Sequence, residues 1–164
     1  LEQRLVADLL GYRITCRLDR IDNLNSGGAA VIDYKTGQSA TPADWLRERL
    51  RDAQIPLYSQ FPDLHVEATV VGSLGASGFH YHGVWVTKGD FAGRPTKLPQ
   101  DRSWAEQVAI WRQQLEQLVQ EYTAGDTRML LSDIDDLKGS HAPLTRVYEQ
   151  LALANGWLCR WEQR

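Results

Sequence analysis

Two aspartates and a lysine stand at spacings that could bring them together in the folded chain. Residues 29–37 read AAVIDYKTG, and the charged segment before them, residues 17–22, reads RLDRID. Side chains two apart in a strand point to the same face, so Asp33 and Lys35 would lie side by side. If the strands on either side of the NSGG turn pair, Asp19 would lie near Asp33 across the ladder.

Such a cluster could carry out phosphodiester hydrolysis. Two neighbouring carboxylates repel each other unless they share a proton or a metal ion. Mg²⁺ and Mn²⁺ prefer oxygen ligands, so Asp19 and Asp33 are candidate metal ligands. The metal would lower the pKa of a bound water and polarise a phosphate oxygen, while Lys35 could position the water or stabilise developing charge. Taken alone, the Asp–Lys pair is more typical of an exposed ion pair of little energetic value.

Hydrophobic alternation predicts the strands that position these residues. From Arg13 onward one face carries Ile14, Cys16 and Leu18, and the other carries the charged residues that lead to Asp19. A tight turn is predicted at Gly11 and a second one at the NSGG motif. Residues 5–36 therefore predict an antiparallel meander of three strands.

The rest of the chain predicts helices and further strands. A helix is expected over residues 42–61, with Thr41 as its N-cap and Pro42 in its first position, and Pro56 should break or kink it near Ile55. Further elements are strands at VEATVVG and FHYHGVWV, a long helix from Trp104 to Tyr122 that ends at Gly125, a loop over 126–141 and a helix over 142–154. This order predicts one α/β or α+β domain over residues 1–164, a mixed sheet flanked by helices.

Composition limits the class of protein. A 164-residue chain with 43% hydrophobic and 24% charged residues is typical of a soluble globular domain. No apolar run approaches the ~20 residues of a membrane span, and no secretory signal opens the chain. Cys16 and Cys159 lack metal-site spacing and favour a reducing, cytoplasmic setting. The start without an initiator Met indicates a fragment of a larger protein, and the net charge of −3 does not itself favour a nucleic-acid partner.

The complete string of motifs is far more specific than its parts. It runs CRLDRID, then VIDYKTG with fourteen residues from Asp19 to Asp33, then QIPLY with Gln54 nineteen residues after Lys35. This string resembles the PD-(D/E)XK nuclease superfamily in its RecB-like branch, which includes the nuclease domains of RecB- and AddB-type helicase–nucleases. VIDYKTG matches that branch throughout, and CRLDRID departs only at Cys16, where the branch usually has Gly.

The resemblance implies a restriction-endonuclease-like fold and a Mg²⁺- or Mn²⁺-dependent deoxyribonuclease of DNA repair or recombination, exo- or endonuclease. DNA would be its substrate and a helicase domain or subunit a candidate partner. Asp19, Asp33 and the main-chain carbonyl of Tyr34 would be metal ligands, and Lys35 would be the catalytic lysine. Two further residues, four apart on one helix face, would support the site and contact DNA: Gln54 and Tyr58.

Departures from the family pattern leave alternatives open. Relatives usually carry an upstream acidic or His ligand, for which Glu2 is a weak substitute, and many hold an iron–sulfur cluster with four cysteines. Here only Cys159 matches, so no iron–sulfur cluster is expected. The chain could instead be a catalytically incomplete module that binds DNA or docks a helicase, or a small-molecule metallohydrolase with a deep closed pocket.

Other residues have simpler interpretations. His80 and His82 share a strand face and could bind a metal, but a polar outer face with Tyr81 inward also explains them. The tryptophan-rich stripe of the long helix is expected to be core, with base stacking as its alternative. Asp22 is interpreted as structural, paired with Arg20 or capping the turn. Two arginines four apart could contact phosphates or lie on a solvated helix face: Arg47 and Arg51.

Overall fold

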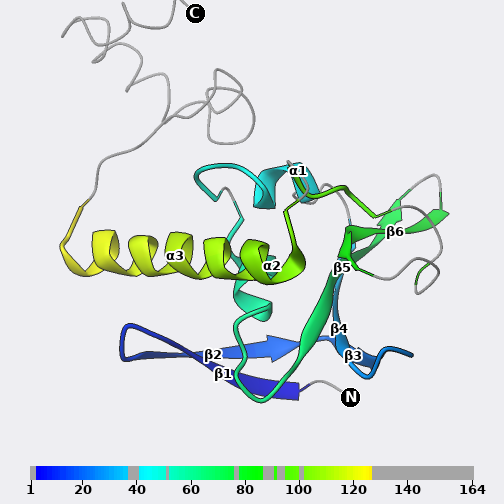
Figure 1. Ribbon diagram of the computed structural model, residues 1–164, viewed down its shortest axis with the longest axis horizontal. Coiled ribbons are helices and arrows are strands. Elements are labelled where there is room, and N and C mark those ends of the chain that lie inside the picture. The colour runs from blue at the N-terminus through cyan, green and yellow to red at the C-terminus, as the bar shows by residue number, and fades with distance from the viewer. Residues whose placement is uncertain are drawn as a thin grey trace, which may run out of the picture. The chain divides into compact units, whose positions relative to one another are not determined.

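The strands form two sheets, a two-stranded hairpin and a four-stranded mixed sheet (Figure 1). The computed structural model describes residues 3–36, 41–50, 52–75, 78–86, 91, 95–99 and 102–126. The hairpin is built from β1 (Gln3–Leu9) and β2 (Tyr12–Leu18), and the larger sheet from β3 (Arg20–Asn23), β4 (Ala29–Thr36), β5 (Val66–Gly75) and β6 (Gly78–Trp85), in that order. β4 and β5 are parallel and the other pairs antiparallel. The predicted mixed sheet is confirmed.

The continuous meander predicted for residues 5–36 is wrong, because the strand pairing is interrupted at Asp19. β2 pairs with β1, whereas β3 pairs with β4 in the other sheet. Leu18 and Ile21 both face the main core although they are three residues apart, which a strand with a period of two cannot achieve. β3 reaches only as far as Ile32 of β4, so among the described residues positions 33–36 of β4 pair with β5 alone. In this part of the chain one edge of β4, beside Asp19, is not paired with a strand, and we call it the open edge.

The helix predicted over residues 42–61 is also wrong. Two short helices form instead, α1 (Pro42–Trp45) and α2 (Gln54–Tyr58). The N-cap prediction is confirmed, since the Asp44 carboxylate accepts hydrogen bonds from the backbone N–H and hydroxyl of Thr41 at 2.9 Å. Pro56 neither ends nor kinks a helix. It lies in the first turn of α2, where a missing N–H leaves no helical hydrogen bond unmade.

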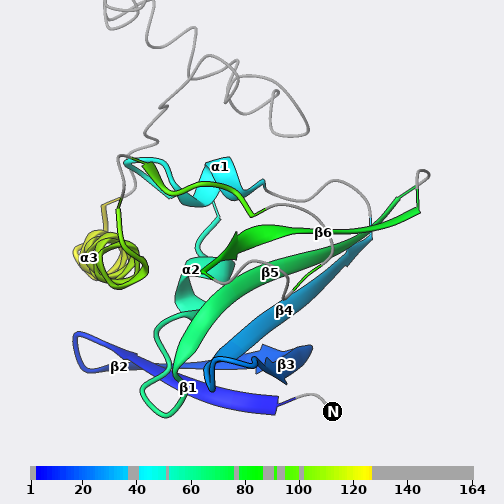
Figure 2. The same cartoon turned by 45° about the vertical axis from the view of Figure 1, so that its right-hand side comes forward.

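The main core fills the space between the two sheets and the helices. The long predicted helix is present as α3 (Trp104–Thr123), and Figure 2 shows α2 between α3 and the four-stranded sheet. Trp111 is fully buried, and its indole N–H donates to the carbonyl of Trp45 at 2.6 Å. The helix stripe is core as expected, except that Tyr122 is 86% exposed. None of the described helices is long and apolar enough to span a membrane.

The opposite face of the four-stranded sheet carries a smaller apolar cluster. Ala30 and Ile32 of β4 belong to this cluster, whereas Val31 belongs to the main core. Tyr81 also packs against the smaller cluster, as its inward orientation required. The described residues lie in one compact unit, Leu1–Asp126, and the elements predicted beyond Asp126 lie outside the described residues.

The turn of the β1–β2 hairpin contains local backbone strain. Leu10 and Gly11 have φ angles of 56° and 83°. Positive φ at both central residues is the requirement of a type I′ hairpin turn, which Asn-Gly meets best. Glycine adopts this conformation freely, whereas a non-glycine residue loses about 1–2 kcal/mol.

Replacing Leu10 with Asn should therefore stabilise the domain by about 1 kcal/mol, because Asn tolerates the left-handed region. Thermal or urea unfolding measures the gain. Leu10→Ala is the matched control, since it removes the same half-exposed side chain and retains the strain. Equal or greater stability of the Ala variant would contradict the explanation.

Candidate active site

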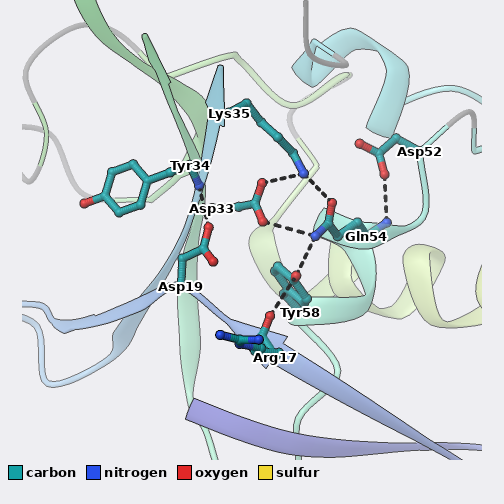
Figure 3. Close-up of polar contacts among 8 residues, drawn as sticks. All are labelled: Arg17, Asp19, Asp33, Tyr34, Lys35, Asp52, Gln54 and Tyr58. Carbon is teal, nitrogen blue, oxygen red and sulfur yellow. Dashed lines mark hydrogen bonds and ion pairs between the residues drawn. The ribbon is translucent and has the colours of Figure 1, made fainter. Parts of the chain in front are cut away.

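The polar residues singled out from the sequence meet at the open edge of β4 (Figure 3). β4 provides Asp33 and Lys35, and the first and last residues of α2 are Gln54 and Tyr58. Asp19 comes from the junction between β2 and β3. In the antiparallel register Arg20 lies opposite Ile32, where the ladder ends, and Asp19 comes next to the following residues of β4, hydrogen-bonded to the N–H of Tyr34.

Asp33 is the most buried of these charged residues, with 4% of its surface exposed. Burial raises the pKa of its carboxyl group above the ordinary value, the adjacent ammonium group of Lys35 opposes that rise, and the charges of Asp19 and Asp52 add to it. Lys35 Nζ lies 2.8 Å from Asp33 Oδ2. A further positive charge nearby would therefore stabilise the ionised form of the Asp33 carboxyl group.

Gln54 connects the lysine, the aspartate and the helix. Its Oε1 accepts a hydrogen bond from Lys35 Nζ at 2.7 Å, and its Nε2 donates to Asp33 Oδ1 at 3.1 Å. The same Nε2 donates to the hydroxyl oxygen of Tyr58 at 2.7 Å. The orientation of the amide is fixed because its oxygen faces the ammonium group and its nitrogen faces the carboxylate.

Tyr58 is a buried residue that connects Gln54 to β2. It is 3% exposed, and its hydroxyl donates a long hydrogen bond of 3.4 Å to the carbonyl of Arg17 in β2. Burial raises the pKa of this phenol, which keeps it neutral. A ring in this position can hold Gln54 and link α2 to β2, but offers DNA no exposed surface.

The Asp19 carboxylate is bound to the backbone of β4. Its Oδ2 accepts a hydrogen bond from the N–H of Tyr34 at 2.9 Å. In an extended strand the N–H and C=O of one residue point to the same edge, so the Tyr34 carbonyl faces the side on which Asp19 lies. The Tyr34 side chain lies on the other face of the sheet, 42% exposed, and its hydroxyl accepts from Arg20 at 3.0 Å. As interpreted from the sequence, Asp22 pairs with Arg20, at 2.7 Å.

Asp52 is a site residue that sequence reasoning missed. Its Oδ1 accepts a hydrogen bond from the backbone N–H of Gln54 at 2.9 Å and thereby fixes the start of α2. Its charge also contributes to the raised pKa of Asp33. The sequence did contain a signal for this role, because an Asp two residues before the first residue of a helix often accepts a hydrogen bond from that residue's backbone N–H.

The available donor atoms fit a hard divalent cation. Asp33 Oδ2 is buried, and although it contacts Lys35 it has no aligned hydrogen-bond donor. Two carboxylates and the carbonyl of Tyr34 are the oxygen ligands that Mg²⁺ and Mn²⁺ prefer. Within the described residues no group of three or more His, Cys, Asp or Glu side chains is arranged to hold a metal. Glu2 lies outside them.

The two histidines face the same side of the sheet as Asp33 but lie two strands away. In the register, Asp33 lies opposite Val71 of β5, which in turn lies opposite His82 of β6. The register separates them by two strand spacings, about 10 Å, and within the described residues no group that includes them is arranged to hold a metal. His80 lies farther along the same strand.

The arginines expected on a helix face are arranged differently. Arg47 lies beyond the end of α1 at Trp45 and pairs with Asp44 at 3.4 Å, so the helical face does not form there. Arg51 lies outside the described residues. A cavity of about 410 Å³ between Arg47 and α3 has no carboxylate of the site in its lining.

Asp33→Asn should make the metal-free protein more stable at neutral pH. Above the raised folded-state pKa the buried carboxylate is ionised and costs stability, and this cost is relieved as pH falls through that pKa towards the unfolded value. The variant lacks the cost at every pH. In EDTA, its melting temperature should exceed that of the wild type near pH 8, and the difference should shrink as pH falls.

The exposed partner of Arg20 gives the control for this experiment. Asp22→Asn removes a carboxylate from the same region without relieving burial, and should give no gain in melting temperature. An Asp33→Asn protein that is less stable than the wild type throughout the pH range would contradict the assigned cost of burial.

Comparison with families of known proteins shows which superfamily the chain belongs to. A family model described as the PD-(D/E)XK nuclease superfamily matches residues 1–133. The chain is also similar to the crystal structure of SSO0001, with 16% identity, a TM-score of 0.41, and coverage of 77% of this chain and 50% of that chain, so it spans half of that protein's length. A search of curated proteins found no match. The mixed sheet flanked by helices is consistent with the restriction-endonuclease-like fold. Because the family model covers most of its length, the chain belongs to the PD-(D/E)XK nuclease superfamily.

Proposed function

We propose that this domain is a metal-dependent deoxyribonuclease of the RecB-like branch that acts in DNA repair or recombination. The observation that carries the proposal is the convergence of Asp19, Asp33, Lys35 and Gln54 at the open edge of β4. Superfamily membership supports nuclease activity in general. The RecB-like assignment depends on the CRLDRID, VIDYKTG and QIPLY motifs.

Three oxygen ligands would hold the metal: the carboxylates of Asp19 and Asp33 and the carbonyl of Tyr34. When bound, Mg²⁺ or Mn²⁺ supplies an acidified water and neutralises charge on the scissile phosphate. Asp19 keeps one carboxylate oxygen on the N–H of Tyr34, which holds that side chain against β4. Asp33 Oδ2 lies towards the positive charge of Lys35.

Lys35 would be the catalytic lysine. About a third of its side chain is exposed, whereas that of Asp33 is almost fully buried, so the ammonium group lies at the boundary between core and solvent. There it can contact a phosphate oxygen or the attacking water and stabilise negative charge that develops in the transition state. Gln54 and Tyr58 act as positioning residues, since their hydrogen bonds fix where the ammonium group lies.

The wider context is part of the same proposal. Residues 1–164 would be one nuclease domain of a larger cytoplasmic protein, working beside a helicase domain or subunit on DNA. An iron–sulfur cluster is not part of the proposed domain, because Cys159 alone matches the cluster pattern.

A second candidate is a nuclease-fold module that binds DNA without cutting it. It is favoured by one observation: within the described residues no group of three or more His, Cys, Asp or Glu side chains is arranged to hold a metal. Binding without cleavage by both this chain and a longer form of the protein would favour this candidate.

Asp33→Ala and Lys35→Ala should each abolish cleavage of labelled DNA in Mn²⁺ or Mg²⁺, with a loss of at least about 100-fold, because each removes a group that acts on the reacting phosphate. Gel assays on single- and double-stranded substrates measure the loss. Asp22→Ala is the matched control and should cleave like the wild type. Unchanged cleavage by either site variant would contradict the proposal.

Gln54→Leu should lower kcat by about 10- to 100-fold, the usual effect of removing a group that orients a catalytic side chain. KM should change little, because the variant alters the position of Lys35 instead of a contact with DNA. Steady-state kinetics separate the two parameters. A rise in KM at constant kcat would show that Gln54 contacts DNA directly.

A further inference from the structure

The β1–β2 hairpin has one apolar face and one face that is rich in arginine. Leu9, Cys16 and Leu18 lie in the main core. The alternate positions point outward, and exposed arginines occupy three of them. We call these residues the arginine face: Arg4, Arg13 and Arg17.

Two of these arginines lie directly opposite each other. The register pairs Arg4 of β1 with Arg17 of β2. Side chains at opposed positions of an antiparallel ladder are close neighbours, so two guanidinium groups there can contact the same anion. Guanidinium groups donate planar pairs of hydrogen bonds that match the oxygens of a phosphate.

The arginine face leads into the candidate active site. Arg13 and Arg17 share one side of β2, which ends at Leu18, and Asp19 follows directly, two residues after Arg17. Positions two apart in a strand are separated by about 7 Å, so the arginine nearest the site is within reach of a phosphate next to the one that is cut. Figure 3 shows Arg17 beside Asp19, with its carbonyl bonded to Tyr58.

We propose that the arginine face binds the phosphate backbone of DNA on one side of the cleavage site. This inference depends on the proposed nuclease function and assigns the path of the substrate. Within the described part of the hairpin, the acidic residue on this face is Asp8, which lies opposite Arg13 and also accepts a hydrogen bond from the Gly11 N–H at 3.0 Å. Arg4 and Arg17, away from this carboxylate, should contribute most.

The test is binding of a fluorescein-labelled DNA oligonucleotide to the full chain, measured by anisotropy in EDTA so that cleavage does not interfere. Arg4→Gln/Arg17→Gln should raise Kd at least tenfold, and Arg13→Gln should raise it less. The slope of log Kd against log salt should fall by about one for each phosphate contact removed. In cleavage assays KM should rise while kcat at saturating DNA stays close to the wild-type value.

Lys97→Gln is the matched control, because it removes one exposed positive charge from the segment that follows β6, at the other edge of the sheet. A Kd and salt slope for the arginine variants no different from those of Lys97→Gln would overturn the inference. The nuclease proposal would survive that result if Asp33→Ala still abolishes cleavage. Since the three arginines are exposed, the variants should keep the wild-type melting temperature, which verifies folding.

Discussion

The buried carboxylate of Asp33 is the constraint on which the rest of the site depends. A charge in a protein core is stable only with partners, and here Lys35 and Gln54 are those partners. Gln54 is itself held by Tyr58 and by Asp52, so the requirement extends into α2 and its start. The position of a short helix is thereby tied to one carboxylate on a neighbouring strand.

The interruption of strand pairing at Asp19 also determines how accessible the edge of β4 is. A continuous ladder would have covered β4 on both edges and closed the site. Because the pairing of β3 with β4 ends at Ile32, no described strand pairs with this edge of the last residues of β4, and the Asp19 carboxylate accepts the hydrogen bond of the Tyr34 N–H there. Asp19 therefore provides a hydrogen-bond acceptor for a backbone N–H of β4 without covering that edge with a strand.

Sequence reasoning predicted most reliably what depends on local periodicity. The alternation in β4 put Asp33 and Lys35 on one face, and the 3.6-residue period found α3 with its correct end. It missed the interruption at Asp19 because distant strands decide which sheet a segment joins. The signal was present in Leu18 and Ile21, two apolar residues three apart that both face the main core. The helix predicted from Pro42 was too long. Helix propensity does not reveal that the helix ends at Trp45, whose carbonyl accepts a hydrogen bond from the Trp111 indole. Asp52 was missed since its role exists only once α2 meets β4.

The parallel pairing of β4 with β5 has a consequence for the order in which the site is assembled during synthesis. The neighbour of β4 follows about thirty residues later, after both helices of the crossover. A nascent chain that ends before Val66 would hold the β1–β2 hairpin, formed by local contacts, but would lack the strand that supports Asp33. The polar residues at the edge of β4 therefore come into position only after β5 has been synthesised and its long-range pairing with β4 has formed.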